Sequence, residues 1–153
     1  MLKIEKSMTI DAPVEEVYAY TIDPEHLPEY FVSILGVRDV KRLPNGDYTF
    51  AYTTQTFGIP AEGTGECVGR VLNERAILKL HIPGVDMTIP TRFESVQGGK
   101  TRVVATTEYN FHEGGFTTKF DETFLMKYLD LASELSMYTL KGRIEMGIPA
   151  AAR

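Results

Sequence analysis

Tryptophan is absent from the sequence, cysteine occurs once, and no continuous apolar run approaches the length of a membrane span. The single cysteine, Cys67, cannot form an intramolecular disulfide. A transmembrane helix needs about 18 continuous apolar residues, so an integral membrane association is excluded. The first residues also lack the apolar core of a signal peptide. We therefore expect a soluble, cytoplasmic protein.

Basic residues are fewer than acidic ones: the sequence has 16 Lys and Arg and 21 Asp and Glu, which gives a formal net charge of -5. Nucleic acids and anionic membranes are bound by clustered basic residues, and the sequence has no basic run. Nucleic acid is therefore excluded as a partner. The length of 153 residues, 43% of them hydrophobic, predicts a single domain over residues 1–153.

The first segment alternates between apolar and polar residues, as a half-buried strand does. Over residues 2–11, Ile4, Met8 and Ile10 share one side, on which Lys6 is the only charged exception. After this strand, proline residues and helical spacing predict two short helices, the first opening at Asp11-Ala12-Pro13 and the second near Pro24.

From about residue 34 to 112 the hydrophobic period is two, and turn residues divide the segment into roughly six strands of an antiparallel meander. Charged residues share one parity, which predicts a face in water. The opposite parity is apolar, and we expect its members on the inner face: Tyr48, Phe50, Tyr52, Leu78, Leu80, Ile82, Ile89, Phe93, Val103, Ala105, Tyr109 and Phe111.

After Gly114-Gly115 the pattern is helical from about Lys119 to Met146. Charged residues occupy only a narrow stripe of this helix, so other structure must cover most of its circumference. We expect the inward arc to be the largest apolar one, formed by Phe120, Phe124, Tyr128, Leu131, Leu135 and Tyr138.

Two motifs near the N-terminus resemble those of the START-like helix-grip superfamily (SRPBCC), in particular its polyketide cyclase/dehydrase and lipid-transport branch. The first reads Ile10-Asp11-Ala12-Pro13-x-Glu15-x-Val17, and the second is Asp23-Pro24-x-x-x-Pro28. Each is followed by an aromatic residue, Tyr18 and Tyr30, where members commonly have tryptophan. The segment Leu140-Lys141-Gly142-Arg143-Ile144-Glu145 also looks like the family's usual close to the final helix.

The resemblance implies an α+β helix-grip fold, in which a seven-stranded antiparallel sheet curls around the C-terminal helix and two short helices follow strand 1. It also implies an elongated cavity for a hydrophobic small molecule. The residues support this independently, because Gly63, Gly65 and Gly69 permit a sharp bend in one strand. We expect the mouth near the two short helices, residues 58–60 and the turn at residues 83–87.

Motifs for nucleophilic, metal or phosphate chemistry are missing. Cys67 has no spaced histidine partner, and His26, His81 and His112 fall in three different elements. The glycines of the bent strand lack the helix that a phosphate-binding loop requires. We expect no cofactor, no metal site and no residue assignable as catalytic.

Acid–base catalysis remains open, because an inward carboxylate would have a raised pKa. The candidates are Glu62, Glu66, Asp86, Arg92, Glu108, Tyr52, Tyr109 and Tyr128. Arg92, Glu94 and Glu108 share the exposed parity and are expected to pair across strands. The orientation of Glu62 and Glu66 stays open, since a bulge in the Gly-rich strand would turn them inward.

Binding or carriage of a hydrophobic ligand, lipid-like or aromatic, is the function these patterns favour. One alternative is an enzyme of the cyclase, aromatase or dehydrase type. The other is an interaction module, which would have a filled cavity and an exposed apolar patch. The expected ligand-binding residues are Leu27, Tyr30, Phe31, Phe50, Tyr52, Leu80, Phe93, Tyr109, Phe111, Phe124, Tyr128 and Leu131.

Overall fold

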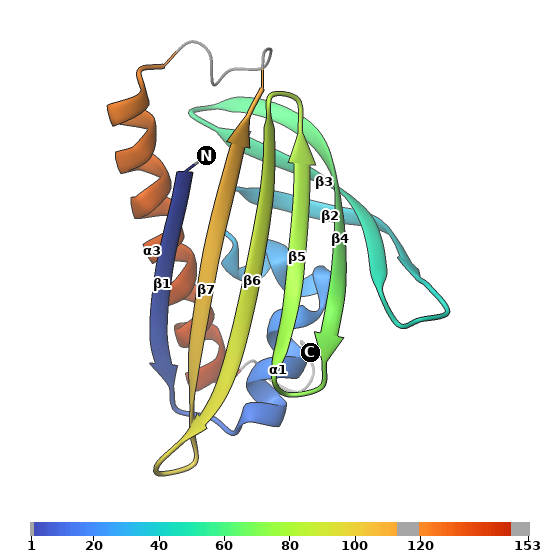
Figure 1. The fold of residues 1–153 in the computed structure, drawn as a ribbon, viewed down its shortest axis with the longest axis vertical. Coiled ribbons are helices and arrows are strands. Elements are labelled where there is room, and N and C mark those ends of the chain that lie inside the picture. Colours follow the sequence, from blue (N-terminus) through green and yellow to red (C-terminus); the bar gives the residue numbers. More distant parts are fainter. Residues whose placement is uncertain (1, 113–119, 148–153) are drawn as a thin grey trace.

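The computed structural model describes residues 2–112 and 120–147, and its element order is the predicted one (Figure 1). A 3-10 turn, η1, is added between the two short helices. The predicted glycine turn at Gly114-Gly115 and the predicted helix start at Lys119 lie outside the described residues. The elements are β1 (Leu2–Ile10), α1 (Val14–Ile22), η1 (Pro24–His26), α2 (Leu27–Tyr30), β2 (Ile34–Arg42), β3 (Tyr48–Thr56), β4 (Ile59–Val71), β5 (Arg75–Ile82), β6 (Val85–Val96), β7 (Lys100–Phe111) and α3 (Glu122–Glu145).

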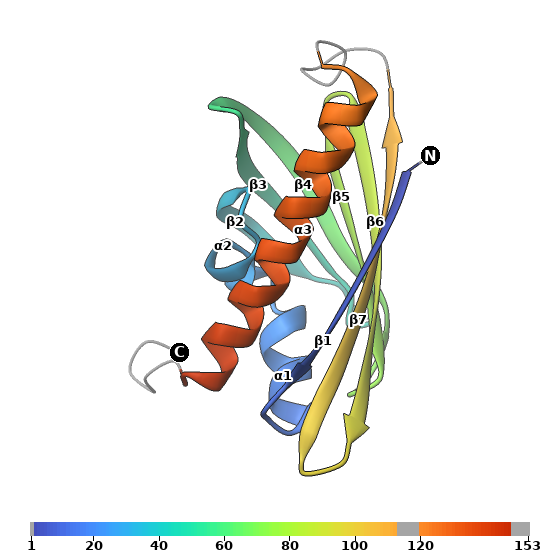
Figure 2. The same ribbon diagram turned by 90° about the vertical axis from the view of Figure 1, so that its left-hand side faces the viewer.

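The seven strands form one antiparallel sheet in the order β1-β7-β6-β5-β4-β3-β2. Strands β2 to β7 pair in chain order, and β1 closes the far side by pairing with β7. The helices lie on one face of the curved sheet, with α3 running along β1 (Figure 2). This arrangement confirms the helix-grip fold.

The alternation along the strands places the side chains as the sequence predicts. Of the twelve residues expected on the inner face, nine are buried, Leu78 and Ala105 are half-buried, and Phe111 is exposed but borders the interior cavity. On the outer face, Glu94 pairs with Arg92 at 3.7 Å and with Arg102 at 3.5 Å. Such exposed pairs are worth little, so the inner face supplies the stability.

Aromatic rings of β3 cover two glycines of β4. Phe50 lies opposite Gly65, where an added Cβ would stand 2.3 Å from the ring Cζ. Tyr52 covers Gly63 in the same way, with its Cζ at 2.6 Å from an added Cβ. Gly63 and Gly65 are therefore needed for the close packing of these two rings. Gly69 has a different role: its φ is +59, and it lies at a register shift of β4 against β5.

Helix α3 faces the sheet with a different arc from the predicted one. Its buried residues are Leu125, Met137, Leu140 and Ile144. The expectation that the largest apolar arc faces inward is wrong at four positions, whose exposed fractions are 47% for Phe124, 54% for Leu131, 48% for Leu135 and 56% for Tyr138.

Polar contacts with β1 and the turn after it fix this rotation of α3. The Lys141 ammonium donates to the Thr9 carbonyl at 2.7 Å, and the backbone N–H of Asp11 donates to the Glu145 carboxylate at 2.8 Å. The charged stripe thus lies along the sheet edge, and the bulky apolar stripe is turned outward. Within the described ranges, neither α3 nor any shorter helix combines the length and the hydropathy of a membrane span.

Candidate functional site

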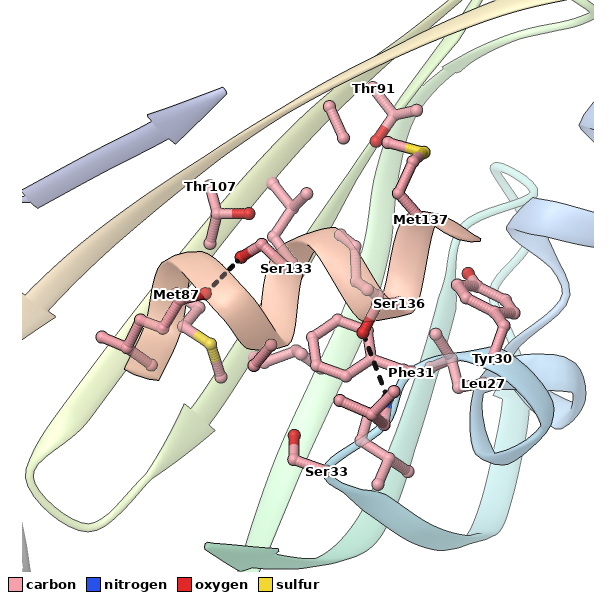
Figure 3. A pocket seen from close by; sticks show the side chains of 18 of the residues that line it. Leu27, Tyr30, Phe31, Ser33, Met87, Thr91, Thr107, Ser133, Ser136 and Met137 are labelled. Carbon is pink, nitrogen blue, oxygen red and sulfur yellow. Dashed lines mark hydrogen bonds between the residues drawn. The ribbon is translucent and has the colours of Figure 1, made fainter. Parts of the chain in front are cut away.

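An apolar cavity of about 160 Å³ lies between α3 and the inner face of the sheet (Figure 3). Small side chains leave this space open. Ala105 of β7 lies opposite Thr91 of β6, which in turn lies opposite Ala76 of β5, so three adjacent strands carry a short side chain at one level. On the helix side, Ser133 and Ser136 project from α3 toward the cavity (Figure 3).

Nine of the twelve predicted ligand-binding residues border this cavity. They come from the α2 region, four inner strands and α3, which the fold brings together from distant parts of the chain. They are Leu27, Tyr30, Phe31, Tyr52, Leu80, Phe93, Tyr109, Phe111 and Tyr128.

Three predicted residues do not border the cavity. Phe50 is buried, but its ring packs on Gly65. Phe124 and Leu131 lie on the outer arc of α3, where Phe124 contacts the ring of Phe57 at a centroid distance of 5.5 Å. Their assignment to the site followed from the wrong rotation of the helix.

The residues expected at the entrance are mostly enclosed. Leu27 and Tyr30 are buried, and the Tyr30 hydroxyl donates to the Thr21 carbonyl at 2.9 Å. The turn residues 58–60 do not line the cavity, and the neighbouring Phe57 ring lies 4.2 Å from that of Tyr128. Leu27 and Tyr30 therefore belong to the wall of the cavity, whereas Val85 and Met87, from the other predicted turn at the mouth, do line it.

Hydroxyl groups supply most of the polarity inside the cavity. The Tyr109 hydroxyl and Ser133 Oγ are 3.5 Å apart, and Tyr52 donates to the His81 carbonyl at 3.3 Å. Burial raises the pKa of Tyr30, Tyr52, Tyr109 and Tyr128 above the ordinary tyrosine value of about 10. These phenols therefore stay protonated near neutral pH and serve as hydrogen-bonding groups.

The two carboxylates of β4 whose orientation was open lie on the outer face. Glu62 accepts hydrogen bonds from Arg38 and Thr53, and the Arg38 bond lowers the pKa of the Glu62 carboxyl. Glu66 lies opposite Thr49 on one side and Lys79 on the other. The irregularity of β4 against β5 falls beyond both, between Val68 and Val71, so it does not turn them inward.

Two histidines meet a carboxylate on the outer face. Asp86 bonds to His81 and, at 2.5 Å, to His112, and these bonds lower the pKa of the Asp86 carboxyl. The sequence missed this grouping, because the β5–β6 turn and the end of β7 create it. His26 lies elsewhere, stacked on Tyr20. In the parts of the chain that the structure describes, no group of His, Cys, Asp and Glu has the geometry to hold a metal ion.

Cys67 is a packing residue that also touches the cavity. Its side chain is buried in a cluster with Tyr48 and Ala76. Burial raises the pKa of the Cys67 thiol to about 11, so the thiol is protonated and a poor nucleophile at neutral pH.

Sequence reasoning missed several polar residues of the cavity. Lys6 is the only charged residue among the described residues that line it. The sequence signal that could have found Lys6 was its position among the inward-facing residues of β1. Thr91 and Thr107 carried the inward parity as well, and Ser133 and Ser136 were hidden by the wrong helix rotation.

A family model described as "Polyketide cyclase / dehydrase and lipid transport" matches residues 1–145. The chain therefore belongs to this family, whose START-like helix-grip fold the structure shows. No curated protein sequence is significantly similar to the chain.

Solved structures share the fold at low sequence identity. The Zhui aromatase/cyclase from Streptomyces sp. R1128 has a TM-score of 0.81 and 16% identity, over 98% of this chain and 97% of that chain. A START superfamily protein from Mycobacterium smegmatis has a TM-score of 0.76 and 13% identity, over 94% and 97% of the two chains. The di-domain ARO/CYC StfQ from the steffimycin biosynthetic pathway has a TM-score of 0.72 and 17% identity, over 94% of this chain and 50% of that one.

Proposed function

We propose that the protein binds a small apolar molecule in the cavity between α3 and the sheet. The single observation that carries this proposal is a partly open cavity of about 160 Å³, bordered mainly by aliphatic and aromatic side chains. Apolar cavities of roughly 150 Å³ stay dry and admit benzene. The family description, which includes lipid transport, points in the same direction.

The size of the cavity favours a small ligand. Sites for drug-sized molecules occupy about 300 to 1,000 Å³, which is larger than the present cavity. A single aromatic ring or a short aliphatic chain fits this volume, whereas a long lipid chain or a fused polycyclic product requires the cavity to expand. We therefore favour a one-ring or short-chain ligand for the conformation described.

A cavity-filling variant tests the proposal. Ala76→Leu adds side-chain volume to the row of small residues inside the cavity, while Ala51→Leu makes the same change on the outer face of β3. We expect toluene, followed by saturation-transfer NMR, to bind the wild type and the Ala51→Leu variant. Binding should fall at least about tenfold in Ala76→Leu, because the added methyl groups occupy the ligand volume. Equal binding by all three proteins would contradict the proposal.

Catalysis of a cyclase or aromatase type is a second candidate. The Tyr109 hydroxyl favours it, since a phenol in an apolar site can donate a hydrogen bond to a ligand carbonyl, while Ser133 Oγ already donates to the Leu129 carbonyl at 2.8 Å. The described lining lacks a carboxylate or histidine to act as a base, which is why we place binding first. Loss of turnover of an aromatic polyketide precursor in Tyr109→Phe, with toluene binding intact, would instead favour the enzyme.

The interaction-module alternative requires a filled cavity. Side chains leave about 160 Å³ of the cavity unfilled, although the exposed apolar side chains of α3 match the other half of that expectation. We therefore do not propose it as the principal function.

A further inference from the structure

We propose that Lys6 forms an anion subsite in the cavity, and that the bound molecule is a small apolar acid whose carboxylate pairs with the Lys6 ammonium. This inference rests on the proposed function and names the chemical class of the ligand. The class is an aromatic ring or a short aliphatic chain that carries one carboxylate.

The position of Lys6 is unusual for a lysine. It lies on the inner face of β1, opposite Ala105 of β7, in a row otherwise formed by apolar residues such as Ile4 and Met8. Its side chain is only 25% exposed and borders the cavity. A cation at this place costs desolvation, which an anionic partner offsets.

The existing partner of Lys6 leaves room for a second anion. Lys6 Nζ lies 3.0 Å from Asp130 Oδ1, and the Asp130 side chain is 54% exposed. Water therefore screens the Asp130 charge better than it screens the ammonium. Since an ammonium has three donors, Lys6 can keep its contact with Asp130 and still donate to a carboxylate in the cavity.

Two hydroxyls lie on the same inner face, on the two strands that follow β1 across the sheet. Thr91 lies opposite Ala105, and Thr107 is two residues along β7 on the same inner face; both border the cavity (Figure 3). Thr107 is buried, and neither hydroxyl has a hydrogen-bond partner within the described chain. Each hydroxyl can therefore donate a hydrogen bond to a polar group of a ligand in the cavity.

The test compares a carboxylate with its neutral amide of the same shape. Benzoate and benzamide are titrated into the intact protein at pH 7 and low salt, with ligand-observed NMR to measure the dissociation constants. We expect benzoate to bind the wild type more tightly. Lys6→Met should weaken benzoate about tenfold, the size of a single charge-assisted hydrogen bond, and leave benzamide unchanged.

A second variant should change the affinity in the opposite direction. Asp130→Asn removes the negative charge that partly neutralises the Lys6 ammonium and keeps a side chain of the same size, so benzoate should bind several-fold more tightly than to the wild type. Lys3→Met is the matched control, because Lys3 lies on the same strand but pairs with Glu108 on the outer face at 3.4 Å. Its benzoate affinity should equal that of the wild type.

Two outcomes overturn the inference in distinguishable ways. If benzamide and benzoate bind equally to the wild type and to Lys6→Met, the anion subsite is wrong while cavity binding stands. If neither compound binds, and toluene also fails to bind, the subsite and the proposed function both fall. Hexanoate and hexanamide form the aliphatic arm, and the arm with the larger effect of Lys6→Met identifies an aromatic or an aliphatic acid.

Discussion

The backbone N–H of Asp11 donates a hydrogen bond of 2.8 Å to the carboxylate of Glu145, 134 residues later in the chain. Lys141 contacts the same carboxylate and the Thr9 carbonyl. The end of α3 is thereby held to the junction of β1 and α1. This contact sets which face of α3 meets the sheet, and so which side chains surround the cavity.

Glu145 should make stability depend on pH. The contacts with Lys141 and the Asp11 N–H lower the pKa of the Glu145 carboxyl. Its contribution is therefore fully present above the unfolded-state pKa of about 4.3 and is lost as the pH falls through the lower folded-state pKa. We expect Glu145→Gln to lower the free energy of unfolding by at most about 1 kcal/mol at pH 7, and by less at pH 3.

Glu134→Gln is the control for this experiment. Glu134 lies on the same helix, is exposed, and makes no hydrogen bond or ion pair with other described residues. Urea denaturation at pH 7 and pH 3 should show little change in this variant at either pH. An equal loss in both variants at pH 7 would contradict the contact of Glu145 with Asp11.

Shortening single leucine side chains of α3 to alanine should show directly which face of the helix is buried. Leu140 is 3% exposed, so Leu140→Ala should cost about 2 to 4 kcal/mol of unfolding free energy. Leu135 is 48% exposed, and Leu135→Ala should cost less than about 1 kcal/mol. Chemical denaturation of the two variants measures both values, and a larger loss for Leu135→Ala would mean that the bulky arc is the buried one.

A methyl group on Gly65 should disrupt the packing of β3 on β4. Gly65→Ala places its Cβ 2.3 Å from the Phe50 ring, so the ring must move, at a cost of about 1 to 3 kcal/mol. Gly36→Ala is the control, because an added Cβ there meets no heavy atom within 4 Å. Thermal unfolding of the double variant Gly65→Ala with Phe50→Ala should reveal coupling, and simple additivity would show that the ring is not the cause.

Removal of single tyrosine hydroxyls should separate structural from free phenols. Tyr30→Phe deletes the donor of a partly buried hydrogen bond to the Thr21 carbonyl and should cost about 1 kcal/mol. The Tyr128 hydroxyl has no hydrogen-bond partner among residues 2–112 and 120–147. Tyr128→Phe should therefore leave the denaturation midpoint almost unchanged. A larger loss of stability in Tyr128→Phe than in Tyr30→Phe would place the structural hydrogen bond at Tyr128.

The strand pattern was predictable because a strand has only two faces. Once the apolar parity is known, residues such as Tyr52, Leu80 and Phe93 are assigned to the interior together. The outward orientation of Glu62 and Glu66 depended on where β4 becomes irregular, and only the pairing with β5 shows that this occurs beyond them.

The rotation of α3 was not predictable from hydrophobicity. The helix has two apolar arcs, and the one with the larger side chains, including Leu131 and Leu135, is exposed. The inward arc contains Ser133 and Ser136, whose polar side chains do not signal a core position but whose small size leaves the space that becomes the cavity. Contacts across the whole chain, such as that of Lys6 with Asp130, decide between the arcs.

Methyl NMR of the protein titrated with toluene tests the central claim most directly, because it reports which side chains surround the bound molecule. The account predicts that the signals of Leu80, Met87 and Met137, which border the cavity, shift together with increasing toluene. The exposed Leu131 and Leu135 should keep their positions. Shifts confined to Leu131 and Leu135, with the inner methyl groups unchanged, would contradict the account by placing the binding surface on the outer face of α3.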